Sequence, residues 1–119
     1  MSAILGLMLL ASYDSSVLTV DLTTIDPIEE QKTEWMQKLA LCESGGNDLI
    51  KVWDSNSKWS VGRYQYQYLT WAKYSKRFGT TRENITDGKL QDKVTRYVLD
   101  TIGSGDWYNC SKTLGKYPS

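Results

Sequence analysis

The chain has 119 residues, the size of one domain, and 40% of them are hydrophobic, which is enough for a modest core. Basic and acidic residues each number 14, so the chain lacks the excess positive charge typical of a nucleic-acid-binding domain. The sequence contains no histidine, which excludes Ser-His-Asp triads, Cys-His pairs and histidine-ligated metal sites. Proton transfer by this protein would therefore depend on carboxylates, Lys, Tyr or Cys.

The aromatic residues are mostly of the amphipathic kind, with five Trp and eight Tyr against one Phe. Tyr and Trp combine an apolar ring with a polar tip, which suits a solvent-exposed groove as well as the core. Flat rings also fit the C–H faces of sugars. The two cysteines, Cys42 and Cys110, allow one bridge, and in a small exported domain we expect a disulfide rather than two buried thiols.

The N-terminal part of the chain differs in character from the rest. Residues 3–11 form an apolar run that is too short to span a bilayer. The run resembles the core of a signal peptide, although no Lys or Arg precedes it and no cleavage pattern follows. We interpret it as an export signal, with an anchor remnant or a packed helix as alternatives. Residues 1–24 are thus predicted to be an apolar segment and linker, and residues 25–119 a single domain that is secreted or held in the cell envelope.

The first predicted helix begins at Asp26, which can cap it, and at Pro27, which suits its first turn. Apolar residues then recur on one face at helical spacing: Ile28, Trp35, Met36, Leu39 and Cys42. Gly45 and Gly46 can end the helix in a left-handed turn. Glu43 therefore lies in the last turn, where apolar surface and the helix dipole would both raise its pKa. The alternative for Glu43 is an ordinary exposed glutamate at a helix end.

A small hairpin or irregular flap is predicted next. Residues 49–53 and 59–66 are rich in aromatic and β-branched types, and the turn-forming residues 54–57 separate them. Three tyrosines then alternate with two glutamines, from Tyr64 to Tyr68. In an extended segment the amides would share one face and the rings the other, as a sugar-binding surface or as an exposed sheet edge.

Three further helices complete the predicted fold, which belongs to the α+β class and is mainly α. A short helix over residues 70–78 ends at Gly79. A longer helix ends at Gly103 and carries apolar residues on one face: Leu90, Val94, Tyr97, Val98 and Ile102. Asp106 can cap a final short helix that turns Trp107, Cys110 and Leu114 inward.

Several separated motifs together resemble one family. The stretch Cys42-Glu43-Ser44-Gly45-Gly46-Asn47 resembles the catalytic signature of lysozyme-like lytic transglycosylases, most of all the resuscitation-promoting-factor branch. The segment from Ser60 to Tyr66 resembles that family's S-x-G-x-x-Q segment, followed by a Thr-Trp pair at residues 70–71. A helix from Gln91 that leads to Trp107-Tyr108-Asn109-Cys110 is similar to its closing Q…W-x-x-C stretch. The resemblance covers about residues 30 to 112, with a longer segment before Ser60 than in that branch.

The resemblance implies a small lysozyme-like domain with a short β flap that acts on peptidoglycan glycan strands. Glu43 would protonate the glycosidic oxygen between N-acetylmuramic acid and N-acetylglucosamine and then act as a base. A Cys42–Cys110 bridge would hold the backbone beside this acid. The resemblance also implies a set of substrate-binding residues: Ser60, Gly62, Tyr64, Gln65, Thr70, Trp71 and Gln91. We expect no cofactor, no metal, no nucleic-acid partner and no stable membrane span, and we expect a monomer.

The number of catalytic carboxylates separates two reactions. Most glycosidases use two acids, whereas a lytic transglycosylase can use one because the 6-hydroxyl of its own substrate is the nucleophile. Asp48 and Asp54 are the nearest candidates for a second acid, but both also suit turn capping. We therefore expect transglycosylation, with lysozyme-type hydrolysis as the alternative. A non-catalytic module that binds peptidoglycan or chitin, and a structural envelope domain, are alternatives from other classes.

Overall fold

The structure is a computed structural model that describes residues 26–119. The described part is mainly helical with one small antiparallel sheet, which confirms the predicted fold class. The predicted apolar segment and linker over residues 1–24 lie outside the described residues. Within residues 26–119, no helix is both long enough and apolar enough to cross a membrane.

Helix α1 (Pro27–Ser44) begins and ends where the sequence predicts. The Asp26 carboxylate accepts a hydrogen bond of 2.9 Å from the backbone N–H of Ile28 and so caps the helix. At the other end, Gly45 adopts a left-handed conformation with φ of 67°. Trp35, Leu39 and their neighbours on the same face are buried, which places Glu43 in the last turn beside the core.

The sheet contains the three strands β2 (Lys51–Trp53), β3 (Trp59–Val61) and β4 (Tyr66–Gln67), in the antiparallel order β2-β3-β4. We call residues 51–67, the sheet with its turns, the flap. The turn between β2 and β3 lies where it was predicted: the Ser57 N–H donates to the Asp54 carbonyl at 3.0 Å.

Residues 64–68, where tyrosines and glutamines alternate, do not form one extended segment as predicted. A second turn occupies residues 62–65, and the Gln65 N–H donates to the Gly62 carbonyl at 3.1 Å. A two-residue period of side-chain directions holds only in an extended backbone. Although the turn interrupts the extended backbone, the predicted sides are kept: Tyr64 and Tyr66 both enter the core, and Gln65 and Gln67 are both only partly buried.

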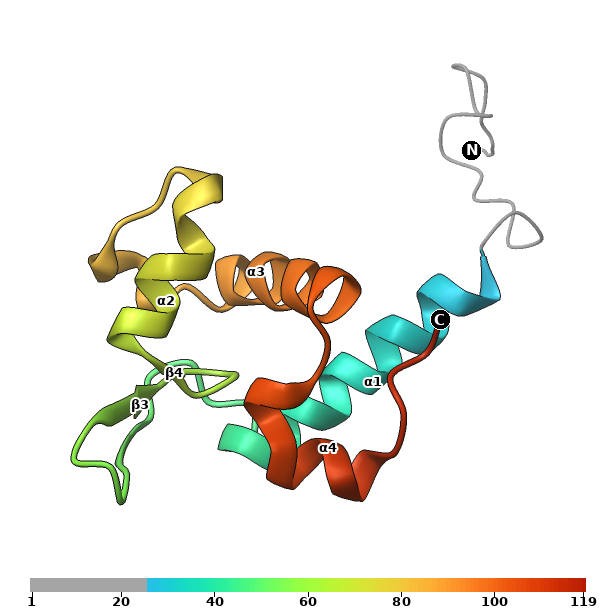
Figure 1. The fold of residues 1–119 in the computed structure, drawn as a ribbon, viewed down its shortest axis with the longest axis horizontal. Helices are drawn as coiled ribbons and strands as arrows, with labels where there is room; N and C mark the ends of the chain where they lie inside the picture. The colour runs from blue at the N-terminus through green and yellow to red at the C-terminus, as the bar shows by residue number, and fades with distance from the viewer. Residues whose placement is uncertain (1–25) are drawn as a thin grey trace, which may run out of the picture.

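The remaining helices surround the flap and α1 (Figure 1). In chain order, they are α2 (Tyr68–Ser75), η3 (Lys76–Phe78), η4 (Arg82–Thr86), α3 (Gly88–Thr101), η5 (Gly105–Trp107) and α4 (Tyr108–Leu114). Helix α4 packs against α1, and α2 packs against α3. Ile102, expected on the buried face of α3, is exposed, because it follows the last helical residue and leaves the buried stripe.

Aromatic side chains join the flap to the C-terminal helices. The ring of Tyr66 lies 5.1 Å from that of Trp71 and 5.7 Å from that of Trp107, centroid to centroid. The Trp107 indole N–H donates a 2.9 Å hydrogen bond to the Tyr64 carbonyl. All four residues are buried, so the flap and the segment before α4 share one core.

A disulfide joins Cys42 near the end of α1 to Cys110 in α4, as predicted. Cys110 is buried, whereas Cys42 is exposed. Disulfides persist in oxidising compartments, so this bond fits a location outside the cytoplasm.

Replacing both cysteines with serine is expected to lower the free energy of unfolding by about 4 kcal/mol, because the bridge closes a loop between residues separated by 68 positions. For a domain of this size, the melting temperature would fall by more than about 10 °C. Thermal melts followed by circular dichroism test this. Reduced wild-type protein is the control and should have the same melting temperature as the variant. A variant with the melting temperature of the oxidised wild type would contradict the expectation.

Candidate active site

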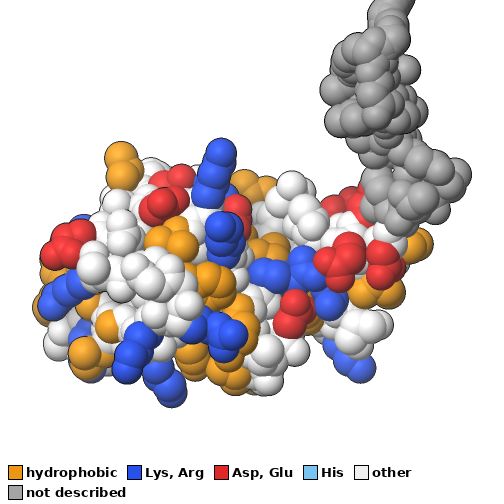
Figure 2. Space-filling view, turned by 90° about the horizontal axis from the view of Figure 1, so that it is seen from above, with side chains coloured by type: hydrophobic (Ala, Val, Ile, Leu, Met, Phe, Trp, Pro, Cys, Tyr) orange, Lys and Arg blue, Asp and Glu red, His pale blue; other side chains and the backbone are white. Residues whose placement is uncertain are grey.

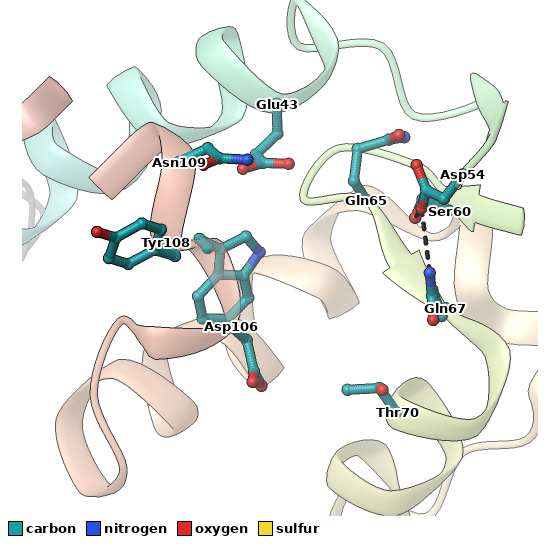
Figure 3. Close-up of a pocket in the computed structure, with 10 residues that line it drawn as sticks. Glu43, Asp54, Ser60, Gln65, Gln67, Thr70, Asp106, Tyr108 and Asn109 are labelled. Atoms are coloured by element: carbon teal, nitrogen blue, oxygen red, sulfur yellow. Dashed lines mark hydrogen bonds between the residues drawn. The ribbon is translucent and has the colours of Figure 1, made fainter. Parts of the chain in front are cut away.

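A cavity of about 410 Å³ lies between the end of α1, the flap and the start of α4 (Figure 3). Its walls come from α1, from the strands and turns of the flap, and from α2, η5 and α4, so they include segments that are far apart in the sequence. The lining residues are Glu43, Asp54, Ser60, Gln65, Gln67, Thr70, Asp106, Trp107, Tyr108 and Asn109. Carboxylates, amides and hydroxyls dominate this lining, so the cavity suits a ligand with many hydrogen-bonding groups.

Glu43 is half-buried in the wall that α1 contributes. Burial raises the pKa of its carboxyl above the ordinary value, and the negative charge of Asp54 raises that pKa further. Asn109 lies beside the Glu43 carboxyl, and Gln65 and Asp54 face it from the other side of the cavity (Figure 3). Glu43 therefore holds its proton to a higher pH than an exposed glutamate does, as a general acid must.

Asp54 is the second carboxylate in the cavity, in the turn between β2 and β3. Its Oδ2 accepts a hydrogen bond from the Ser60 hydroxyl and another, of 3.1 Å, from the Gln67 side-chain amide. Gln67 is in turn held by a 3.1 Å bond from its amide nitrogen to Asn56. Two neighbouring strands thus fix the orientation of this carboxylate toward Glu43.

Asp48, the other candidate for a second acid, does not line the cavity. Its carboxylate accepts two hydrogen bonds from Arg63, of 2.9 Å and 3.1 Å. Arg63 also pairs with Asp92 at 2.7 Å, and these carboxylates raise the pKa of the guanidinium. Asp48 therefore belongs to an ion-pair cluster with Arg63 and Asp92, which holds the flap outside the cavity.

Three of the predicted substrate-binding residues are brought together with Glu43: Ser60, Gln65 and Thr70. Gln65 reaches the cavity from the turn over residues 62–65, where its backbone φ is 58° and its amide donates to the Gly62 carbonyl at 3.1 Å. Thr70 faces the cavity from the first turns of α2 (Figure 3).

The other four predicted substrate-binding residues do not line the cavity: Gly62, Tyr64, Trp71 and Gln91. The Tyr64 hydroxyl donates to Asp92 at 2.7 Å, and burial is the main cause of the raised pKa of this phenol. The Trp71 indole donates to the Thr81 carbonyl at 3.3 Å. These side chains act inside the fold, because their polar tips are already paired with protein groups in a buried setting.

Gly62, predicted to bind substrate, instead allows a close approach of the Gln91 side chain to the backbone. Gly62 has φ of 82°, and a Cβ there would lie 2.5 Å from the Gln91 side-chain nitrogen. Only glycine leaves room for this buried amide at that backbone conformation.

The wall formed by η5 and the start of α4 was missed as a source of site residues: Asp106, Trp107, Tyr108 and Asn109. Asp106 was interpreted only as a helix cap and Trp107 only as a core residue. One signal could have located Asn109: it precedes Cys110, just as Glu43 follows Cys42, so a bridge between the cysteines brings both to the same place. In the described part of the chain, no group of three or more Cys, Asp or Glu is arranged to hold a metal ion.

Gly62→Ala is expected to destabilise the protein more than Gly79→Ala does. Both glycines have positive φ, of 82° and 69°, so alanine at either position adds about 1–2 kcal/mol of backbone strain. A Cβ at Gly79 meets nothing within 4 Å, whereas at Gly62 it would displace the buried Gln91 amide, at a further cost of about 1–3 kcal/mol. Urea unfolding of the two variants measures the difference, and equal losses would count against the role assigned to Gln91.

Asp54→Asn is expected to lower the pKa of Glu43 without returning it to the ordinary value of 4.5, since burial is the larger cause of the shift. Titration of the glutamate side-chain carboxyls by ¹³C NMR measures this, with Glu43→Gln identifying the resonance. The folded state binds the Glu43 proton more tightly than the unfolded chain. Stability should therefore fall as pH rises from the ordinary pKa through the folded one. A Glu43 titration that is identical in Asp54→Asn would show that the two carboxyls do not interact.

Comparison with protein-family models gave no match for this chain, and comparisons with curated proteins and with solved structures gave none either.

Proposed function

We propose that this protein is a lytic transglycosylase that cleaves the β-1,4 bond between N-acetylmuramic acid and N-acetylglucosamine in peptidoglycan, with Glu43 as acid and base. The observation that carries the proposal is the half-buried Glu43 carboxyl, with its raised pKa, in a polar cavity. The resemblance of the Cys42–Asn47 stretch to lysozyme-like lytic transglycosylases supports the choice of substrate. The disulfide supports a site of action outside the cytoplasm, secreted or in the envelope.

In the proposed reaction, protonated Glu43 donates its proton to the glycosidic oxygen as the bond to the anomeric carbon breaks. The 6-hydroxyl of the same muramic acid residue then attacks that carbon, and the Glu43 carboxylate accepts the hydroxyl proton. The products are a 1,6-anhydromuramic acid end and a free N-acetylglucosamine hydroxyl, with no water consumed.

The cavity wall supplies hydrogen bonds that could orient such a substrate. The amides of Gln65 and Asn109 flank the Glu43 carboxyl, and the hydroxyl of Thr70 lies further along the cavity (Figure 3). Amides both donate and accept, which suits sugar hydroxyls and N-acetyl groups alike. The exposed ring of Tyr108 offers an apolar face for a sugar ring at the rim.

Lysozyme-type hydrolysis is a second candidate, and Asp54 is the observation that favours it. A second carboxylate across the cavity from the acid can stabilise the developing positive charge, form a glycosyl intermediate or orient water. Asp54 lies in the same cavity as Glu43, and its hydrogen bonds from Ser60 and Gln67 engage only Oδ2.

Glu43→Gln is expected to reduce cleavage of purified peptidoglycan roughly 10²–10⁴-fold, because the amide cannot donate a proton to the leaving oxygen. Release of soluble fragments from labelled sacculi measures the rate. Glu34→Gln, which removes an exposed carboxylate from the same helix, is the matched control and should retain activity. Full activity in Glu43→Gln would refute the catalytic role. A wild-type protein that binds sacculi without cleaving them would instead indicate a glycan-binding module.

Mass spectrometry of the fragments separates the two reactions, because an anhydro end is one water lighter than a reducing end. Under transglycosylation, the wild type yields anhydro ends, and Asp54→Asn still yields them. If the wild type yields only reducing ends and Asp54→Asn loses them, hydrolysis replaces transglycosylation as the function.

A further inference from the structure

Two tryptophans are exposed on the face of the flap that points away from the cavity. Trp53 and Trp59 are paired across β2 and β3, with ring centroids 5.0 Å apart and an interplanar angle of 71°. Their exposed fractions are 57% and 40%. Their chain neighbours Asp54 and Ser60 line the cavity, and successive side chains of a strand point to opposite faces of the sheet. The two rings therefore belong to a separate surface.

This surface is concave. A hollow of about 240 Å³ beside Trp53 and Leu69 adjoins one of about 510 Å³ beside Lys51. Three residues line both hollows and make them continuous: Trp59, Tyr68 and Arg82. We call these six residues (Lys51, Trp53, Trp59, Tyr68, Leu69 and Arg82) the flap groove.

Cations are held against the aromatic rings of the flap groove. The Lys51 ammonium lies 4.9 Å from the centroid of the Trp59 ring, and the Arg82 guanidinium lies 4.2 Å from that of Tyr68. The ion pairs among the described residues involve other cations, those of Lys32, Arg63 and Arg96. Lys51 and Arg82 therefore keep their hydrogen-bond donors available for an anion while the rings hold them in place.

The combination of groups selects the class of ligand. Exposed indole rings fit the C–H faces of sugars. The two hollows are lined by three cations (Lys51, Lys58 and Arg82) against one carboxylate (Glu83), and this positive excess favours a sugar polymer that carries carboxylates. A membrane surface would require a convex apolar face that enters the headgroup region, whereas this face is hollowed. Acidic and basic side chains are interspersed on the face seen in Figure 2, in keeping with the zero net charge, so attraction of an anion depends on local groups such as these.

We propose that the flap groove is a second glycan-binding site, which holds a carboxylate-bearing stretch of polysaccharide while the cavity acts on another. The inference rests on the proposed function only in the choice of polymer, peptidoglycan, whose peptide stems carry carboxylates. Because the rings of the groove lie on the face of the flap opposite the cavity, a glycan held in the groove leaves the cavity open.

The test measures binding to insoluble sacculi in the Glu43→Gln background, so that no cleavage is needed. Trp53→Ala/Trp59→Ala is expected to weaken co-sedimentation at least tenfold. Lys51→Gln/Arg82→Gln should weaken it severalfold and reduce its sensitivity to salt. Amidating the carboxylates of the sacculi is the matched change in the ligand, and it should weaken binding of the parent protein while leaving the Lys51→Gln/Arg82→Gln protein unchanged.

Ile102→Ala and Lys89→Gln change an exposed apolar and an exposed basic residue elsewhere, and both should bind like the parent. Unchanged sacculus binding in both groove variants would overturn the proposal. Equal binding of the parent protein to native and to amidated sacculi would also overturn it. So would groove variants that lose binding to anionic phospholipid vesicles but not to sacculi. If the double tryptophan variant fails to fold by circular dichroism, the double cation variant decides, since its side chains are outside the core.

The binding and cleavage experiments can refute the two proposals independently of each other. A wild-type protein without cleaving activity whose groove variants still lose sacculus binding would remove the proposed function and keep this site. Cleavage that depends on Glu43, with no effect of the groove variants on binding, would remove this site and keep the proposed function.

Discussion

The buried side chain of Gln91 holds the backbone on which the candidate site is built. Its oxygen accepts a 2.8 Å hydrogen bond from the Tyr64 N–H, and its nitrogen donates to the carbonyls of Val61 at 3.1 Å and Ile85 at 2.5 Å. A fully buried amide that lost these partners would be costly, so the arrangement has little freedom. It fixes the turn over residues 62–65, and that turn directs Gln65 into the cavity.

On the α1 side of the cavity, both chain neighbours of Glu43 are bonded to other segments. Cys42 precedes Glu43 and is bonded to Cys110 in α4. Ser44 follows Glu43, and its hydroxyl bonds at 2.8 Å to the Arg63 carbonyl in the flap turn. Glu43 therefore sits at the junction of α1, α4 and the flap, and these contacts produce the burial that raises its pKa. The properties of the acid follow from how three distant segments meet.

The flap presents different chemistry on its two faces because side chains alternate along its strands. Asp54, Ser60 and Gln67 give the cavity face its carboxylate, hydroxyl and amide. Trp53 and Trp59 give the other face its rings. If both proposals hold, a sheet of three short strands would take part in cleaving a polymer on one face and in holding it on the other.

Four local features could be predicted from the amino-acid sequence: the Asp26 cap, the Gly45 helix end, the disulfide and the position of Glu43 in the last turn of α1. These depend on neighbouring residues or on a pairing with one possible partner. By contrast, Asp54 faces Glu43 and Gln91 is buried because of how distant elements pack together, which the sequence does not show. The turn over residues 62–65 replaces the extended backbone expected there, and its partner Gln91 is 27 positions from Tyr64. Periodicity describes one element at a time, so it cannot show which side chain a distant element will bury.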